Sequence, residues 1–196
     1  MKSRELIKEL SRYPVFTVKD IASIANKEIG YAYTLAYRLK ETGQIYKIEK
    51  GKYTLETDPF AIASWIAWPS YISGWAALSY HRLTEQLPFT IHVVTTIKRK
   101  RKTISFGNGR IEFLTVKKDR FFGFEKEMYK NKEIFVAEKE KAIIDAVATK
   151  KMTVQEASEI IESNRNKLSK RKLFLYGKII HGLNAKLRAL VNDKRT

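Results

Sequence analysis

The stretch TVKDIASIANKEIGYAYTLAYRLKETGQIYKIEKGKYTL, residues 17–55, carries the signals of two helices and a β-hairpin. Thr17 and Asp20 have the spacing of a capping box, which predicts a short helix directly after Thr17. The residues of this helix that are expected to face inward are Ile21, Ala22, Ile24 and Ala25. A turn is then expected between Asn26 and Gly30, before a second and longer helix.

This longer helix is expected from about Tyr31 to Thr42, with Gly43 as its C-terminal signal. Apolar residues recur at spacings of three and four, and they are expected to face the core: Ala32, Leu35, Ala36 and Leu39. The residues left for the outer face are Tyr31, Tyr33, Thr34, Tyr37, Arg38 and Glu41. Two short strands around Gly51 follow and predict a hairpin.

Upstream, Ser3 caps a first predicted helix, which Tyr13-Pro14 ends. Three helices followed by a basic hairpin are the plan of a winged helix-turn-helix, whose third helix enters the major groove of DNA. Residues 1–56 are therefore predicted to be a DNA-binding domain. The side chains predicted to contact DNA from this domain are Lys27, Tyr31, Tyr33, Thr34, Tyr37 and Arg38, together with Lys47, Lys50 and Lys52 on the hairpin.

Two alternatives for this segment stay open at the level of sequence. Tyr33 or Tyr37 could face the core, and the lysines could simply solvate a small domain. Winged helices also serve in contacts between proteins, so the fold alone does not specify a DNA partner.

Residues 57–196 are predicted to form an α/β domain, with C-terminal helices from about residue 153. Asp58-Pro59 starts a buried helix that is expected to run to Trp68. The segment from Tyr71 to Gly74 is expected only to lead into a second buried helix, from Trp75 to Leu83. Five strands are expected next, over residues 89–97, 103–106, 110–116, 121–129 and 133–137. In the first strand, apolar residues alternate with His92 and Thr96, which are expected on a polar face, and Gly107-Asn-Gly109 is the hairpin turn between the second and third strands. Three helices follow: residues 138–149, one opened by the capping box at Thr153, and a long one over about 169–191. The fold class is therefore α+β.

The last predicted helix has a heptad-like seam, formed by Leu173, Tyr176, Ile180, Leu183, Leu187 and Leu190. Packing on its own domain is favoured over a dimer seam, and the sequence leaves the oligomeric state open as a monomer or a weak dimer.

The formal net charge of +17 points to a polyanionic partner, with nucleic acid first and an anionic membrane second. The densest cluster is a run of five consecutive cations, and we include all five among the predicted DNA contacts: Lys98, Arg99, Lys100, Arg101 and Lys102. We call residues 98–102 the basic run. Phosphate contacts from such residues release counterions, so DNA binding is expected to weaken steeply with salt.

Catalytic motifs are missing from the sequence. The three histidines lack metal-ligand spacing, and there is no GxSxG, phosphate-binding loop or dinucleotide-binding glycine motif. Glu138, Glu140 and Asp145 lie among lysines, which favours a surface ion-pair network over a nuclease centre. The sequence therefore predicts no enzyme, no cofactor and no metal. The lack of cysteines and of long apolar segments, and an N-terminus unlike a signal peptide, predict a cytoplasmic protein with no membrane partner.

Over roughly residues 5–150 the chain resembles the AbiEi-type antitoxins, the DNA-binding halves of bacterial and archaeal type IV toxin–antitoxin pairs. The resemblance rests on the order and spacing of Gln44–Leu55, Asp58-Pro59-Phe60, Tyr71-Ile-Ser73, Ala76–Leu83, Ile91–Thr95 and Val136–Asp145. It implies a winged helix that binds operator repeats in double-stranded DNA and represses its own operon. It also implies a partner toxin of nucleotidyltransferase type, and a DNA-binding surface that is extended and positive, as the basic run would provide.

The sequence thus predicts a DNA-binding transcriptional regulator that acts as an autorepressing antitoxin. Two rivals remain: a winged-helix transcription factor that has no toxin, and an RNA-binding module.

Overall fold

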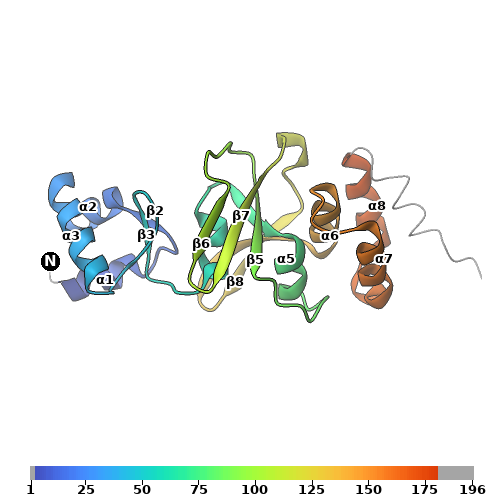
Figure 1. The fold of residues 1–196 in the computed structure, drawn as a ribbon, viewed down its shortest axis with the longest axis horizontal. Helices are drawn as coiled ribbons and strands as arrows, with labels where there is room; N and C mark the ends of the chain where they lie inside the picture. The colour runs from blue at the N-terminus through green and yellow to red at the C-terminus, as the bar shows by residue number, and fades with distance from the viewer. Residues whose placement is uncertain (1–2, 181–196) are drawn as a thin grey trace, which may run out of the picture.

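The computed structural model describes residues 3–180 of the 196-residue chain. Along the long axis of the molecule, a bundle of helices lies at one end, a large sheet lies in the middle, and further helices lie at the other end (Figure 1). The fold is α+β, as predicted. None of the helices in residues 3–180 has the length and apolarity needed to cross a bilayer.

The N-terminal part of the structure contains three helices and a three-stranded sheet of order β1-β3-β2. Its elements are α1 (Ser3–Leu10), β1 (Phe16–Thr17), α2 (Val18–Ala25), α3 (Ile29–Glu41), β2 (Tyr46–Glu49) and β3 (Lys52–Thr54). The predicted helices and hairpin are confirmed, with α3 starting two residues earlier than expected. Strand β1, which pairs antiparallel with β3, was not predicted because it is only two residues long.

Local signals set the ends of these helices. Thr17 caps α2, and a reciprocal capping box with Asp20 is present as predicted. Asn26 ends α2 in the left-handed conformation, and Gly43 follows α3 with φ of 68°. Asparagine and glycine are the residues that adopt this backbone at least cost, so the two turns around α3 are fixed locally.

The larger part contains a six-stranded mixed sheet of order β6-β7-β5-β4-β9-β8. Its strands are β4 (Ser70–Ser73), β5 (Thr90–Thr95), β6 (Thr103–Phe106), β7 (Gly109–Thr115), β8 (Phe124–Tyr129) and β9 (Lys132–Ala137). Its helices are α4 (Pro59–Ile62), η1 (Ala63–Trp65), α5 (Gly74–Tyr80), η2 (Lys118–Arg120), α6 (Lys139–Ala148), α7 (Val154–Ser163), η3 (Arg165–Lys167) and α8 (Lys170–Ile179).

Three expectations for this part need correction. The apolar segment 59–68 is not one helix: α4 and η1 each make about one turn. Residues 70–73, expected only to lead into a helix, form β4, which lies between β5 and β9 inside the sheet. Strand β5 is buried on both faces, so His92 lies in the interior and not on a polar face.

The expectation for residues 169–191 is met only in part within the described residues. Ser169 caps α8, and the side chains of Leu173, Tyr176 and Ile180 pack into the large hydrophobic core of their own chain. The predicted continuation to Val191 and the seam residues after Ile180 lie outside the described residues.

The two parts of the molecule are joined through the β2–β3 hairpin. The N-terminal helices have their own small core, whereas Ile48 on β2 packs into the large core of the six-stranded sheet. Lys52 Nζ donates to the Ile66 carbonyl, and Lys132 Nζ contacts both the Ser11 carbonyl and Glu56. In Figure 1 this hairpin accordingly lies between the first three helices and the large sheet.

The prediction of a surface ion-pair network around Asp145 is wrong. Lys141 and Asp145 form a fully buried ion pair one turn apart on α6. The Tyr71 and Ser73 hydroxyls donate to Asp145 at 2.9 and 2.8 Å, so the pair connects α6 to β4. The buried ammonium of Lys141 is compensated by the Asp145 carboxylate, by a hydrogen bond to the Tyr71 hydroxyl and by the faces of the Phe122 and Tyr71 rings.

Candidate nucleic-acid interface

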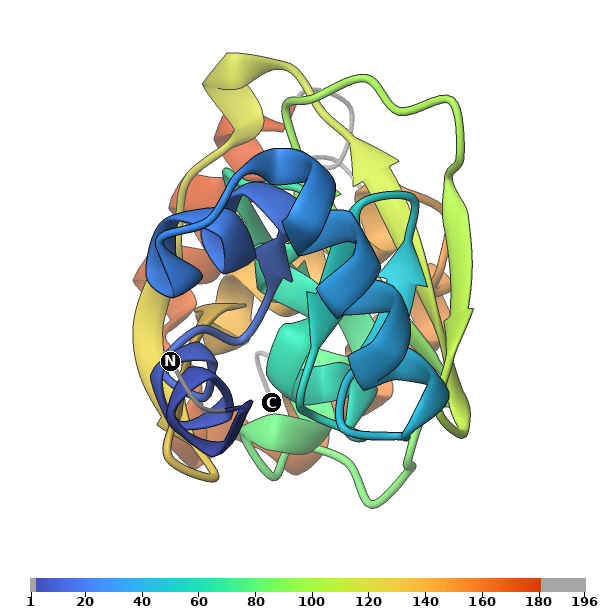
Figure 2. The same ribbon diagram turned by 90° about the vertical axis from the view of Figure 1, so that its left-hand side faces the viewer.

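Helix α3 has one buried face and one exposed face, because its small residues lie on one side. Ala32, Ala36 and Leu39 are buried, and the two alanines lie in the core that α3 shares with α2. Figure 2 looks onto this end of the molecule and shows α3 at the front, with the rest of the molecule behind it. The outer face of α3 is therefore open to a partner.

All of the outer-face residues named from the sequence are exposed. Tyr33 and Tyr37 are 59% and 63% exposed, so neither faces the core. Tyr31 is half exposed, and Thr34 and Arg38 are exposed as well. Such a row of hydroxyl groups with one guanidinium can donate hydrogen bonds to phosphates and to base edges in a groove.

Arg38 is the cation of this face with no hydrogen bond or ion pair to its guanidinium within residues 3–180. Glu41, the acid nearest to it in sequence on α3, instead pairs with Lys40, whose ammonium lies 2.6 Å from the carboxylate. Arg38 therefore meets an incoming ligand without first breaking a contact.

The lysines of the hairpin divide into two groups. Lys47 and Lys50 are exposed, as is Lys27 at the start of the turn before α3. Lys52, by contrast, lies 3.0 Å from Glu49 and also donates to the Ile66 carbonyl. Lys52 therefore helps to hold the hairpin against the segment between η1 and β4.

The basic run likewise contains exposed cations and one cation that is already paired. The side chains of Lys98, Lys100, Arg101 and Lys102 are exposed in the loop between β5 and β6. The Arg99 side chain is only 13% exposed: its guanidinium lies 2.5 Å from Glu49 and 4.2 Å from the centre of the Phe113 ring. Arg99 thus fixes the basic run next to the β2–β3 hairpin.

The Glu49 carboxylate accepts hydrogen bonds from Arg99 of the basic run and from Lys52 of the hairpin. Burial raises its pKa, but the hydrogen bonds and charges of Arg99 and Lys52 outweigh burial and hold the pKa below its ordinary value. Glu49 is therefore charged at neutral pH and connects the hairpin to the basic run. Sequence reasoning missed it because fifty positions separate Glu49 from Arg99 and no local pattern joins them.

The described residues contain no group of three or more histidines and acids that could hold a metal ion. His81 contacts the Ala137 carbonyl at 2.7 Å, and His92 contacts Glu112 at 3.3 Å. These two histidines therefore make separate contacts within the fold and do not share a site.

The three helices, the small sheet and the hairpin of residues 3–55 define a winged helix-turn-helix. Comparison with protein families identifies its kind: residues 4–55 match the family described as "Transcriptional regulator, AbiEi antitoxin". The resemblance predicted from the sequence is thereby confirmed over these residues, while its expected extension to about residue 150 lies outside the match. No curated protein matches the chain.

Proposed function

We propose that this protein is a transcriptional regulator that binds duplex DNA through residues 1–56. Residues 57–196 would form a second domain that supports and extends the DNA contact. The observation that carries this proposal is the exposed face of α3, where three tyrosines, a threonine and an unpaired arginine lie on a winged helix-turn-helix of the AbiEi family. A helix in this position enters the major groove in proteins of this class.

In this proposal the remaining cations bind the DNA backbone. Lys27, Lys47 and Lys50 flank α3, and the four exposed cations of the basic run add a second cluster beside the hairpin. Lys52 and Arg99 take a different role, because they are engaged with Glu49 and position the hairpin and the run. The sequence-specific part of binding would come from α3, and much of the affinity from phosphate contacts.

We further propose that the protein is an autorepressing antitoxin in the cytoplasm, with operator repeats as its DNA and no catalytic activity of its own. This step is supported by the description of the matching family, a transcriptional regulator and antitoxin. Its partner would be a nucleotidyltransferase-like toxin. The rival is a regulator of the same fold without a toxin, and the absence of a nucleotidyltransferase gene beside this one would favour the rival.

The test of DNA binding is footprinting on the DNA upstream of its own gene, followed by titration of that duplex at fixed salt. Single-stranded DNA and structured RNA of equal length serve as competitors. Protection of a repeated sequence and preference for the duplex are expected. Tighter binding of the RNA at matched salt would contradict the proposal and support the RNA-binding alternative.

A further inference from the structure

A second site lies in the larger part of the molecule, away from the α3 face. It is an open cavity of about 710 Å³ at one end of the six-stranded sheet. Its walls come from five places: the start of α4, α5 with the turn after it, the start of β5 with the segment before it, the β6–β7 turn, and the end of β8. A volume of this size is typical of sites for small organic ligands.

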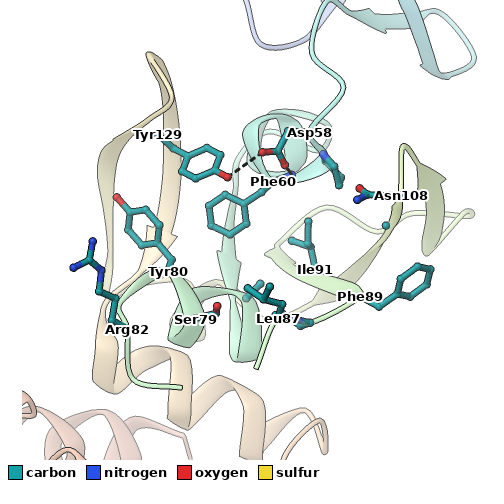
Figure 3. A pocket seen from close by; sticks show the side chains of 14 residues that line it. Asp58, Phe60, Ser79, Tyr80, Arg82, Leu87, Phe89, Ile91, Asn108 and Tyr129 are labelled. Carbon is teal, nitrogen blue, oxygen red and sulfur yellow. Dashed lines mark hydrogen bonds between the residues drawn. The ribbon is translucent and has the colours of Figure 1, made fainter. Parts of the chain in front are cut away.

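One wall of the cavity is a cluster of aromatic rings. The Phe60 ring stacks on Tyr80 with centroids 5.8 Å apart and meets Tyr129 edge-on at 4.8 Å. Figure 3 shows this cluster on one side, Phe89 and Asn108 on the other, and Ile91 and Leu87 between them. Leu87 and Phe89 are exposed at the rim, at 89% and 66%. The cavity therefore offers flat apolar surfaces on both sides.

The turn that carries Asn108 is held close to the start of α4. A Cβ on Gly107 would lie 2.6 Å from the Thr57 carbonyl oxygen, and one on Gly109 would lie 3.1 Å from the Pro59 ring. A larger residue at Gly107 would require movement of the backbone, and one at Gly109 would require the Pro59 ring to shift by a few tenths of an ångström, so the two glycines let this turn approach Pro59 closely. The cavity wall that includes Asn108 is thus formed before any ligand arrives.

The charge of the cavity wall is positive, because its acid is already paired. The Asp58 carboxylate accepts hydrogen bonds from Tyr129 at 2.9 Å, from Lys130 at 2.8 Å and from the Phe60 amide. Arg82 also lines the cavity, and within residues 3–180 its guanidinium makes no hydrogen bond or ion pair. The side chains of Ser79 and Asn108 are likewise uncommitted within that range.

We propose that this cavity binds a small ligand that combines a planar ring with an anionic group. The ring would lie against Phe60 and Tyr80, and the anion would pair with Arg82, which Figure 3 shows beside Tyr80. Ser79 and Asn108 supply further hydrogen bonds. A cationic ligand is disfavoured because Asp58 is neutralised by Lys130. The proposal does not depend on DNA binding, since none of the residues that line the cavity belongs to α3 or the basic run.

Replacing Arg82 by glycine is a test in which ligand affinity should fall while the stability of the fold should rise. It follows the end of α5 with φ of 56°, a left-handed backbone that glycine adopts at least cost. Arg82→Gly therefore removes the guanidinium and also removes the backbone strain that a non-glycine residue has at this φ. Lys150 takes the same conformation after α6, with φ of 60°, and does not line the cavity, so Lys150→Gly is the matched control.

The experiment is isothermal titration of the full-length protein with nucleoside monophosphates, the corresponding nucleosides, inorganic phosphate, salicylate and indole-3-acetate. At least one ring-bearing anion should bind, more tightly than the neutral nucleoside or phosphate alone. Arg82→Gly should raise the melting temperature and weaken that binding by about tenfold or more. Lys150→Gly should raise the melting temperature with unchanged affinity.

The control for binding at the α3 face is Arg38→Ala, which should leave the affinity for the small anion unchanged. Absence of binding by every ring-bearing anion at millimolar concentration would overturn the proposal. Equal affinity in wild type and Arg82→Gly would overturn it as well, because the anion would then bind elsewhere.

Discussion

Arg38 and Lys50 carry the same charge in different settings, and their substitutions should therefore differ. Arg38 lies on the exposed face of α3, which would enter the major groove in the proposed complex, whereas Lys50 lies at the hairpin turn. Arg38→Ala should lose discrimination between operator and random duplex by about 1–3 kcal/mol. Lys50→Ala should weaken all duplexes alike and flatten the salt slope by about one. Fluorescence anisotropy titrations on both duplexes measure this, and equal, unselective losses would mean that α3 does not read bases.

His92 is a buried histidine with one unsatisfied nitrogen. Its Nε2 lies 3.3 Å from Glu112, while Nδ1 has no hydrogen-bond partner within residues 3–180 and faces Gly74. Burial lowers the pKa of His92 below 6.5; the charge of Glu112 opposes this shift and that of Lys151 adds to it. The folded protein therefore keeps His92 neutral where the unfolded chain would already bind a proton.

This shift predicts a specific pH dependence of stability. As pH falls below 6.5, the unfolded state takes up a proton at His92 before the folded state does, so the free energy of unfolding decreases. His92→Gln removes the titrating group and should lose less stability between about pH 7.5 and pH 5.5 than wild type does. Urea unfolding of both proteins at the two pH values measures the difference. Parallel losses would show that His92 is not the group responsible.

At the scale of elements, the buried Lys141–Asp145 pair connects α6 to β4. Removing one partner leaves the other charge buried without compensation, which costs about 3–5 kcal/mol in proteins. Asp145→Ala should therefore destabilise the fold by that amount in urea unfolding. Glu162→Ala, which removes an exposed pair with Arg165 at 3.8 Å, should change stability by less than about 0.5 kcal/mol. A similarly small effect of Asp145→Ala would mean that Lys141 is not left as an uncompensated buried charge.

The elements that sequence predicted correctly are those with local signals. The capping boxes at Thr17 and Thr153 and the glycine turn between β6 and β7 each fix structure within a few residues. Strand β4 was missed because Tyr71-Ile-Ser73 is short and lacks alternation; it is a strand because β5 and β9 pair with it from distant parts of the chain. A buried lysine such as Lys141 cannot be told from a surface one by sequence alone.

In the candidate site, too, the features with a local sequence signal could be predicted, and those that depend on tertiary contacts could not. The spacing of Ala32, Ala36 and Leu39 was enough to identify the buried face of α3, and with it the exposed face. The roles of Arg99 and Lys52 depend on Glu49 and Ile66, which tertiary packing brings close. Sequence reasoning therefore identified where cations are numerous, but not which of them are already engaged.

At the scale of the whole molecule, the positive charge extends far beyond the winged helix. Figure 1 shows α3 at one end and α7 and α8 at the other, with the large sheet between them. The basic run is tied to the hairpin by the Arg99–Glu49 pair, whereas the exposed cations Lys170, Arg171 and Lys178 lie on α8. A duplex bound along α3 and the basic run would therefore leave α8 away from the DNA.

This arrangement predicts which lysines determine the salt dependence of DNA binding. Replacing Lys98, Lys100 and Lys102 together by glutamine should make the negative slope of log K against log salt less steep by about 2.7, or about 0.9 for each phosphate that a lysine no longer neutralises. The matched variant, with Lys170, Arg171 and Lys178 replaced by glutamine, changes the net charge equally and should leave the slope unchanged. The slopes come from titrations of the operator duplex at several salt concentrations. If both variants reduce the steepness of the slope equally, the duplex also contacts α8, and the footprint extends over the length of the molecule.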